Sequence, residues 1–416
     1  MDQGTALKRS AYISTIENPI LQKIFYSKTP EPVSFVDTVI HEVVKLTASD
    51  LLFEPRSENV VARTRIDGVL YKLGDISPKV YEHISARIKV LSSLDPTEKR
   101  RIQEGQFSLD HDDRIVNLRV EITQTIHGEL IVIRVHERRT IVMELSKLGL
   151  SIPAYKIYQN MLSQRSGLIL VCGPTGCGKT TTLYSTISNL NQNNKNNVMT
   201  IEDPVEFQLE GINQMQTQKD TGFTFAVGLR TILRLSPDIV FVGEIRDKET
   251  AKIAVESGLT GLLVLSTLHA EDSIRALFRT LDLGIEAYLL NSSLMGIVSQ
   301  RLIRKNCSDC KVEYKPQEGE IDLFKKVLGR VPAKLMRGRG CEVCQHLTYK
   351  GRTGIFEVFE MNAKVRSLIR EKTNEDVLRN ILIEEGFVTL LSDGLEKAEE
   401  GITTVDEVLR NSLRIV

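Results

Sequence analysis

Residues 173–184 of the chain read GPTGCGKTTTLY. This stretch fits the pattern G-x-x-x-x-G-K-S/T from Gly173 to Thr180, follows the apolar run LILVC and opens a segment with apolar residues at helical spacing. A glycine-rich loop between a buried strand and a helix turns backbone N–H groups toward phosphate at a helix N-terminus, where the helix dipole favours negative charge. The sequence therefore predicts a phosphate-binding loop in an α/β nucleotide-binding domain.

The loop assigns specific contacts to its residues. Lys179 would reach the β- and γ-phosphates, and the hydroxyl of Thr180 would hold Mg²⁺. The full set of predicted nucleotide contacts is Gly173, Pro174, Thr175, Gly176, Cys177, Gly178, Lys179, Thr180 and Thr181. The alternative, a glycine-rich turn with a stray lysine, does not explain the strand before the loop and the helix after it.

Two further strand ends carry acids. The apolar strand in PDIVFVGEIRD ends close to Glu244, which predicts a carboxylate beside Mg²⁺ and its waters at the carboxyl edge of the sheet. The stretch TIEDPVEF crowds Glu202, Asp203 and Glu206 into five positions. Alone it would read as a solvated loop; beside the other two motifs it suggests a carboxylate that orients the attacking water.

The length and composition of the chain limit the class of protein to which it can belong. A length of 416 residues favours two or more domains. Equal numbers of basic and acidic residues, 54 of each, argue against a protein dominated by nucleic-acid binding. The N-terminus lacks the apolar core of a signal peptide, and no stretch approaches the roughly 18 apolar residues of a membrane span. We expect a cytosolic protein whose six cysteines do not form a disulfide scaffold.

The pattern of the chain predicts its organisation. Residues 1–33 read as an extended N-terminal extension, and 34–140 as an α+β domain that begins with a helix capped by Ser34 and Asp37. That domain holds a hairpin turning at Asp67-Gly68 and a helix capped by Ser77 that ends at Asp95-Pro96. Residues 141–152 form a linker. Residues 153–416 form the nucleotide-binding domain, with a cysteine-bearing insert at about 301–355 and C-terminal helices at 356–416.

Short apolar runs around the loop (LILVC, VMTI, DIVFVG and LLVLSTL) suit strands buried on both faces of a parallel sheet. With these motifs the chain resembles the ATPases of type II secretion and type IV pilus assembly, the GspE/PulE/PilB family. The likeness runs from about residue 48, through ASDLLFEP, RTRIDGVL, RIKVLSSLD and HGELIVIRV, which are similar to that family's PAS-like N-terminal domain. It continues through MTIEDPVEF to STLHAED in the family's order.

The resemblance implies a RecA-like P-loop ATPase with a PAS-like N-terminal domain, acting as a ring, usually a hexamer. It implies that ATP is hydrolysed between the two domains, with Glu202 activating water and Glu244 on the Mg²⁺ side. His269 would be a sensor near the γ-phosphate. The family's arginines, which neutralise phosphate charge, map onto Arg119, Arg134, Arg230 and Arg234. The last two are spaced i,i+4 and would share a helix face; for the first two, exposed strand positions are the plain alternative.

The chain departs from the family pattern at four positions, Cys177, Leu262, Ser236 and Gln106. Leu262 replaces the first histidine of the histidine box and puts any scheme of two sensing histidines in doubt. Cys177 replaces a serine in the phosphate loop. It is either a small residue in a serine position or a thiol whose oxidation would block ATP.

Two C-x-x-C pairs, Cys307-Ser-Asp-Cys310 and Cys341-Glu-Val-Cys344, are separated by thirty residues. Four thiolates arranged in two pairs suit a closed, structural Zn²⁺ site. Free buried cysteines or a redox pair are the alternatives. Cys172, in an apolar strand, reads as a core residue. In the family that the chain resembles, a tetracysteine insert is typical of secretion and pilus-extension members.

These features together predict a motor for pilus extension or pseudopilus assembly. It would lie at the cytoplasmic face of the inner membrane, joined to it only through partners, above all a platform protein. We keep three alternatives: a retraction ATPase of the same family, a conjugation or DNA-translocating ATPase, and a regulator with an inactive site. The basic stretches SQRLIRKN and MRGRGC keep the DNA alternative open, although each is also an ordinary solvated stretch.

Overall fold

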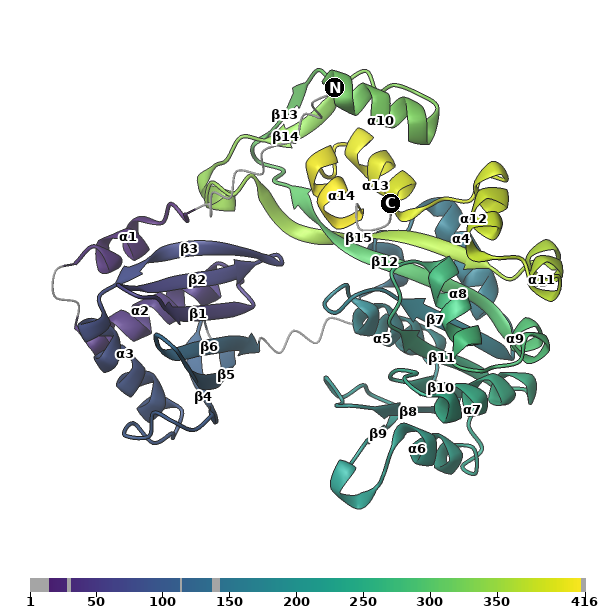
Figure 1. Ribbon diagram of the computed structural model, residues 1–416, viewed down its shortest axis with the longest axis horizontal. Helices are drawn as coiled ribbons and strands as arrows, with labels where there is room; N and C mark the ends of the chain where they lie inside the picture. Colours follow the sequence, from purple (N-terminus) through teal and green to yellow (C-terminus); the bar gives the residue numbers. More distant parts are fainter. Residues whose placement is uncertain (1–14, 28–30, 113, 137–142, 413–416) are drawn as a thin grey trace. The chain divides into compact units, whose positions relative to one another are not determined.

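The computed structural model describes residues 15–27, 31–112, 114–136 and 143–412. The chain divides into two compact units. The first comprises residues 1–139 with 307–310 and 339–350, and the second comprises 140–306, 311–338 and 351–416. Figure 1 shows the helices and strands of both units. The predicted linker at 141–152 lies partly outside the described residues.

The first unit is built on an antiparallel sheet in the order β3-β2-β1-β6-β5-β4. The predicted hairpin is confirmed, because Ile66 pairs with Val69 and both Asp67 and Gly68 have positive φ, as a tight two-residue turn requires. The strands are β1 Asp50–Pro55, β2 Val60–Ile66, β3 Val69–Ile76, β4 Gln103–His111, β5 Arg114–Thr125 and β6 Gly128–His136.

Three helices pack on this sheet: α1 Pro19–Phe25, α2 Pro32–Lys45 and α3 Pro78–Leu91. Ser77 caps α3 as predicted, but the helix ends at Leu91, before Asp95-Pro96. The prediction of a capping box at Ser34 and Asp37 was wrong. Helix α2 begins at Pro32, and the carboxylate of Glu31 accepts hydrogen bonds from the first free N–H groups of this helix. Nor is the segment before it simply extended. Within it α1 buries apolar side chains in the core of the unit.

The second unit contains a sheet in the order β15-β12-β7-β11-β10-β8-β9. The apolar runs form strands that are buried throughout and pair in parallel, as the sequence predicts. The strands are β7 Gly167–Cys172, β8 Val198–Glu202, β9 Asn213–Gln216, β10 Ile239–Val242, β11 Leu263–Leu268, β12 Leu294–Asn306 and β15 Tyr349–Glu360.

Helices cover both faces of this sheet, which is why its strands are apolar on both sides. Alternate residues of β7 enter two different cores: Leu168 and Leu170 pack with α6, α7, α8 and α9, whereas Ile169 and Val171 pack with α4 and α5. The helices are α4 Ile152–Leu162, α5 Lys179–Leu190, α6 Phe225–Ile232, α7 Lys248–Leu259, α8 Ser273–Asp282 and α9 Ala287–Ser293.

The remaining elements surround β12 and β15. The insert forms a two-stranded sheet of β13 Lys311–Tyr314 and β14 Leu335–Gly338 with helix α10 Glu318–Leu328. The C-terminal helices begin after β15, at Ala363, so residues 349–360 are a strand of the main sheet. They are α11 Ala363–Arg370, α12 Glu375–Glu384, α13 Leu390–Glu399 and α14 Val405–Ser412. Among the described residues, no helix combines the length and apolarity that a bilayer crossing needs.

Candidate active site

The strand order brings the predicted motifs to one edge of the second unit's sheet. Strands β7, β11, β10 and β8 are consecutive neighbours and parallel, so their carboxyl ends lie together. The phosphate loop follows β7, His269 follows β11, Glu244 lies two residues after β10, and Glu202 ends β8. In open α/β sheets this is the edge where ligands bind.

The phosphate loop has the backbone geometry that its glycines predict. Gly173, Gly176 and Gly178 all have positive φ. A Cβ atom on Gly173 would lie 2.5 Å from Sγ of Cys177, so the loop needs a glycine there. Helix α5 begins at Lys179 without a side-chain cap, which leaves its first N–H groups for an anion. Nζ of Lys179 donates to the carbonyl oxygens of Gly173 at 2.8 Å and Pro174 at 3.0 Å.

Cys177 is a buried part of this loop. Its side chain is 4% exposed, and burial raises the pKa of its thiol. A buried, protonated thiol is a poor nucleophile. This environment favours Cys177 as a small residue that fills a serine position, and it weakens the redox interpretation.

Glu244 presents one free oxygen. Its Oε1 accepts from Arg246, while its Oε2 is buried and has no hydrogen-bond partner among the described residues. Gly243 allows this placement, since a Cβ there would come within 3.3 Å of the backbone of Ile201 and Glu202. Carboxylate and threonine hydroxyl oxygens are hard ligands of the kind that Mg²⁺ prefers. Glu244 and Thr180 thus have the right donor chemistry for the predicted magnesium ion.

His269 lies beside Glu244. Its Nε2 is 3.6 Å from Oε2 of Glu244. Burial lowers the pKa of His269, and the charge of Lys179 acts in the same direction. The imidazole is therefore neutral at pH 7. Leu262 lies at the opposite, amino end of β11, where its carbonyl accepts from the N–H of Gly167. The substitution at 262 leaves the surroundings of His269 intact.

Glu202 is the most enclosed of the predicted acids, with 3% of its surface exposed. Its Oε2 accepts from the hydroxyl of Tyr184, and its Oε1 accepts from Oγ1 of Thr200 at 2.6 Å and Nε2 of Gln214 at 3.1 Å. The exposed Asp203 and Glu206 do not share this environment. The crowd of three carboxylates that the sequence suggested is therefore one buried carboxylate and two solvated ones.

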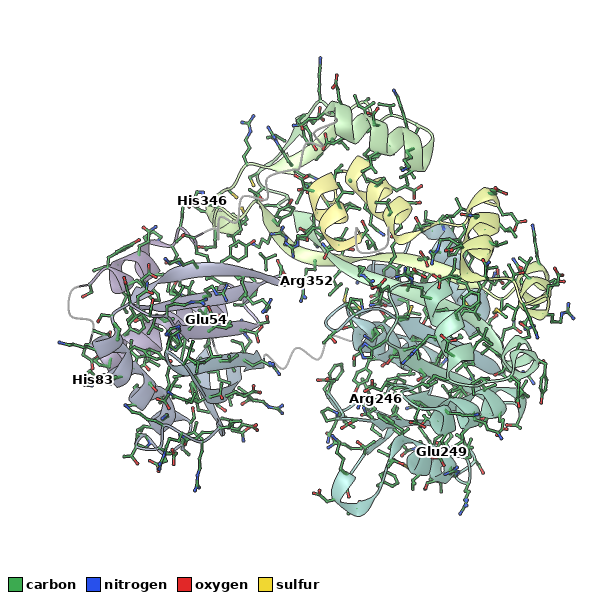
Figure 2. All side chains as sticks on the ribbon, in the orientation of Figure 1. Glu54, His83, Arg246, Glu249, His346 and Arg352 are labelled. Carbon is green, nitrogen blue, oxygen red and sulfur yellow. The ribbon has the colours of Figure 1, made fainter. Side chains whose placement is uncertain are left out.

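The two arginines of the second unit, Arg230 and Arg234, do not share the helix face that the sequence predicted. Arg230 lies on α6 and pairs with Glu249 at 2.5 Å; Figure 2 labels Glu249 and Arg246. The prediction that Arg234 lies on the same helix face was wrong. Helix α6 ends at Ile232, and Arg234 lies in the exposed turn after it. No glycine or proline marks this helix end in the sequence, so the pattern alone did not reveal it.

The two arginines of the first unit are direct neighbours. Arg119 on β5 pairs in register with Arg134 on β6, and both are exposed. Like charges directly opposite each other are destabilising in a sheet. These two arginines belong to a row of residues that pair across neighbouring strands of the sheet. In order, the row is Arg65, Asp50, Arg134, Arg119 and Gln106. Asp50 pairs with Arg65 at 3.1 Å and Arg134 at 3.6 Å. Sequence reasoning missed Arg65 and Asp50 because strand register is not visible in it.

The four paired cysteines come together in the first unit. Their sulfur atoms all lie within 4.8 Å of one another. Sγ of Cys307 is 3.9 Å from that of Cys341, and Sγ of Cys344 is 3.8 Å from those of Cys310 and Cys341. Four sulfurs bound to one Zn²⁺ at about 2.3 Å in a tetrahedron are about 3.8 Å apart. The cluster has the dimensions of a tetrahedral zinc site and is far too open for disulfides.

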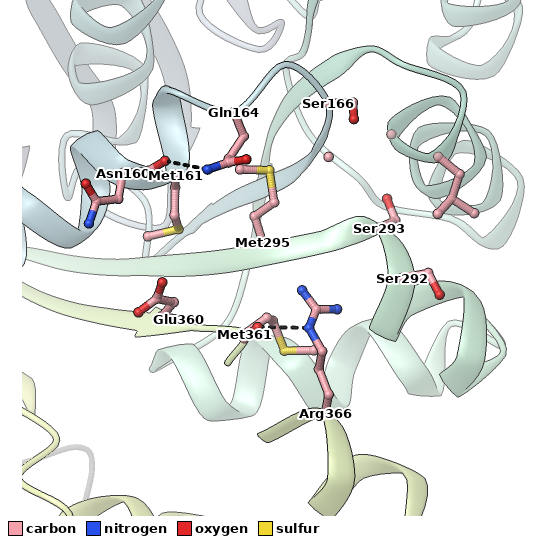
Figure 3. Close-up of a pocket in the computed structure, with 13 residues that line it drawn as sticks. Asn160, Met161, Gln164, Ser166, Ser292, Ser293, Met295, Glu360, Met361 and Arg366 are labelled. Atoms are coloured by element: carbon pink, nitrogen blue, oxygen red, sulfur yellow. Dashed lines mark hydrogen bonds between the residues drawn. The ribbon is translucent and has the colours of Figure 1, made fainter. Parts of the chain in front are cut away.

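A separate pocket of about 370 Å³ lies at the opposite edge of the same sheet (Figure 3). Gly167, the first residue of β7, lines it together with Ser293, Met295 and Arg366. The phosphate loop follows the last residue of the same strand. This pocket is therefore distinct from the candidate nucleotide site.

Comparisons with known proteins agree on one family. The model of the family described as Type II/IV secretion system protein matches residues 28–410. The chain is 41% identical over 410 residues to the type II secretion system protein E of Pseudomonas aeruginosa, covering 98% of this chain and 81% of that protein. It is 38% identical to the type II secretion system ATPase E of Vibrio cholerae, covering 95% and 78%.

Solved structures have the same fold. The ATPase DotB of Legionella pneumophila is similar at a TM-score of 0.65 and 20% identity, covering 92% of this chain and 96% of that chain. The pilus retraction motor PilT with bound ADP is similar at a TM-score of 0.56 and 25% identity, covering 90% and 96%. The chain belongs to the family of type II/IV secretion system proteins.

Proposed function

We propose that this protein is an ATP-hydrolysing motor that powers assembly of a type II secretion pseudopilus or a type IV pilus. The observation that carries the proposal is the shared sheet edge, where the phosphate loop, His269, Glu244 and Glu202 follow neighbouring parallel strands. Phosphoryl transfer to water needs these parts: a cradle for the phosphates, acids on the metal side and a carboxylate that orients water. Its relatives include a type II secretion system ATPase E.

Each residue has a proposed task. The loop N–H groups and Lys179 bind the phosphates of ATP. Thr180 and Glu244 would hold Mg²⁺, which would supply positive charge against the phosphates. Glu202 orients the attacking water and accepts its proton. His269, uncharged at neutral pH, hydrogen-bonds near the γ-phosphate. The similarity to the pilus retraction motor PilT supports a nucleotide ligand, because that structure was solved with bound ADP.

The arginines supply positive charge to the reaction. Arg119 and Arg134 are proposed to act on the phosphates from the first unit, because an unfavourable pairing of like charges is explained by an anionic ligand. Arg230 and Arg234 keep the same proposed role. Arg230 would have to exchange its partner Glu249 for phosphate in order to fill it.

We propose that Cys307, Cys310, Cys341 and Cys344 hold a structural Zn²⁺. The spacing of the sulfurs supports it, and four thiolates leave no open position for chemistry. In the assembly motors that the sequence resembles, such an insert accompanies extension, so the cluster favours extension over retraction. If the purified protein contained no zinc, that result would favour the alternative of a retraction motor.

The motor needs a ring and a partner. We propose that the protein forms a homo-oligomeric ring, a hexamer as is usual in the family that its sequence resembles. The ring would dock on a platform protein at the cytoplasmic face of the inner membrane. That platform protein would convert the motion of the ring into addition of pilin-like subunits. The support is the relationship to type II secretion system proteins. The DNA-translocating alternative loses one of its sequence arguments: Arg301 is buried, and Arg304 pairs with the buried Glu407 at 2.6 Å. SQRLIRKN is thus not an exposed basic stretch throughout.

The test is ATP hydrolysis by the purified protein as a function of Mg²⁺ concentration. The wild type hydrolyses ATP, and Lys179→Ala abolishes hydrolysis because it removes the cation on the β- and γ-phosphates. Glu244→Gln raises the Mg²⁺ concentration for half-maximal rate, because it removes one negative charge beside the ion. A Lys179→Ala variant with the wild-type rate would contradict the assignment of this site. Hydrolysis that requires DNA would favour the translocase.

A further inference from the structure

We infer that Gln300 and Arg301, adjacent on β12, are positioning residues for the nucleotide site: Gln300 holds the phosphate loop, and Arg301 holds the segment after His269. Neither residue is assigned to contact the nucleotide. The inference rests on the proposed function of this site and deepens it, because it says what fixes the loop in its binding geometry.

The register of the sheet places Gln300 beside the loop. Strand β12 runs parallel to β7, with Val298 opposite Val171 and Ser299 opposite Cys172. The next residue on β12 is Gln300, and the next on the other strand is Gly173, where the loop begins. A Cβ atom on Gly173 would lie 2.6 Å from the carbonyl oxygen of Gln300. The start of the loop is packed directly on this strand.

The side chain of Gln300 joins the other half of the loop to α5. It is 2% exposed. Its Nε2 donates to the carbonyl oxygen of Cys177 at 2.8 Å, and its Oε1 accepts from Oγ1 of Thr182 at 2.8 Å. A loop that turns N–H groups toward phosphate leaves carbonyl groups facing the protein. A buried carbonyl without a donor is costly, and Gln300 supplies that donor for Cys177.

Arg301 performs the matching task for the neighbouring segment. It is 7% exposed, and its guanidinium donates to the carbonyl oxygens of Glu271 at 2.5 Å and Gln300 at 3.2 Å. Glu271 comes two residues after His269. One strand therefore sets the positions of both the phosphate loop and the histidine segment, although each follows a different strand.

Loss of the Gln300 hydrogen bonds should therefore weaken nucleotide binding more than it lowers the stability of the fold. Without the Gln300 bonds, the free loop populates other conformations, and nucleotide binds only the competent fraction. The apparent affinity then falls in proportion to that fraction. Loss of a hydrogen bond to a buried carbonyl group predicts roughly tenfold weaker binding of ADP for Gln300→Leu.

The experiment is an equilibrium titration of the purified protein with a fluorescent ADP derivative and Mg²⁺. The ligand is excited directly, because the chain has no tryptophan. The variants are Gln300→Leu, Gln300→Glu and Thr182→Val, with the double variant Gln300→Leu/Thr182→Val. Thr186→Val is the matched control, because Thr186 lies one turn further along α5 and its hydroxyl bonds to Tyr158 and to the backbone carbonyl of Thr182 rather than to Gln300.

We expect roughly tenfold weaker binding for Gln300→Leu and a smaller loss for Thr182→Val. The double variant should bind no more weakly than Gln300→Leu, because both changes remove the same bond. Thr186→Val should bind like the wild type even where thermal unfolding shows a similar loss of stability. Gln300→Glu, which keeps the acceptor for Thr182 but loses the donor to Cys177, should also bind more weakly.

Wild-type affinity in both Gln300 variants would overturn the role of Gln300. If Gln300→Leu does not fold, wild-type affinity in Gln300→Glu and Thr182→Val overturns it equally. For Arg301, we expect Arg301→Lys to lower kcat more than ADP affinity, and an unchanged kcat would remove Arg301 from the inference. A wild-type protein that does not bind ADP would instead contradict the proposed function itself.

Discussion

The hydroxyl of Tyr184 on α5 donates a hydrogen bond to Oε2 of Glu202 at the end of β8. Both side chains are buried. Burial raises the pKa of Tyr184, and the hydrogen bond to the Glu202 carboxylate raises it further, so the phenol remains a donor throughout the range of an activity assay. The carboxylate proposed to orient water is thus held by a side chain of the helix that begins at the phosphate loop.

The first prediction concerns that bond. Tyr184→Phe removes the donor and keeps the ring, so Glu202 loses one of its three fixed contacts. We expect kcat to fall about tenfold with little change in KM, because positioning of the carboxylate matters most in the transition state. Tyr158→Phe is the control: it removes an equally buried hydroxyl, which bonds to Thr186. Steady-state kinetics that show equal kcat for Tyr184→Phe and the control would contradict the prediction.

The second prediction concerns pH. Burial and the charge of Lys179 hold the pKa of His269 below its ordinary value of about 6.5. The imidazole is neutral at pH 7 and gains its proton only as the pH falls below that value. We expect kcat/KM to fall on the acid side, because a second positive charge then lies close to Lys179. His269→Gln should remove this acid limb; a profile unchanged by the substitution would assign the limb to another group.

The third prediction concerns zinc. Metal analysis of the purified protein should give about one Zn²⁺ per chain, and Cys310→Ser should lose it. Structural zinc contributes directly to folding, so the variant should unfold at a temperature lower by several degrees. Cys177→Ser, which changes a thiol outside the cluster, should keep its zinc. A zinc-free wild type with normal stability would show that the cluster is a set of reduced thiols.

The fourth prediction separates stability from activity in the arginine row. Arg119→Gln relieves the repulsion from Arg134, so the free energy of unfolding should stay the same or rise by up to about 1 kcal/mol. Hydrolysis should nevertheless fall at least tenfold, because the removed charge acts on phosphate. Arg101→Gln, which changes a highly exposed arginine of the same unit, is the control. Lower stability together with unchanged hydrolysis would make Arg119 a structural residue.

The features that could be predicted from the sequence are those determined by the types of a few adjacent residues. The phosphate loop is fixed by its own glycines and lysine, the parallel strands by apolar runs, and the hairpin by Asp67-Gly68. Each depends on a few adjacent residues. The order of the four motifs along the chain also indicated the shared sheet edge, since acids at the ends of buried parallel strands meet there.

The features that sequence did not predict depend on register between distant segments. Gln300 touches the loop only because β12 pairs with β7 at a particular offset. Arg119 and Arg134 were identified one by one, but their direct pairing appears only in the sheet. Helix ends without glycine or proline were equally hidden, which is why Arg234 was assigned to α6. The PAS-like assignment of the first unit and the predicted domain limits stay predictions.

Nucleotide binding and ATP hydrolysis should separate in two variants of the same pocket. Glu202→Gln should bind ATP with wild-type affinity and hydrolyse it at least a hundredfold more slowly in a single turnover, because only the water-orienting carboxylate is lost. Lys179→Ala should lose binding itself. A Glu202→Gln variant that hydrolyses ATP at the wild-type rate would contradict the assignment of Glu202 and of the edge around it.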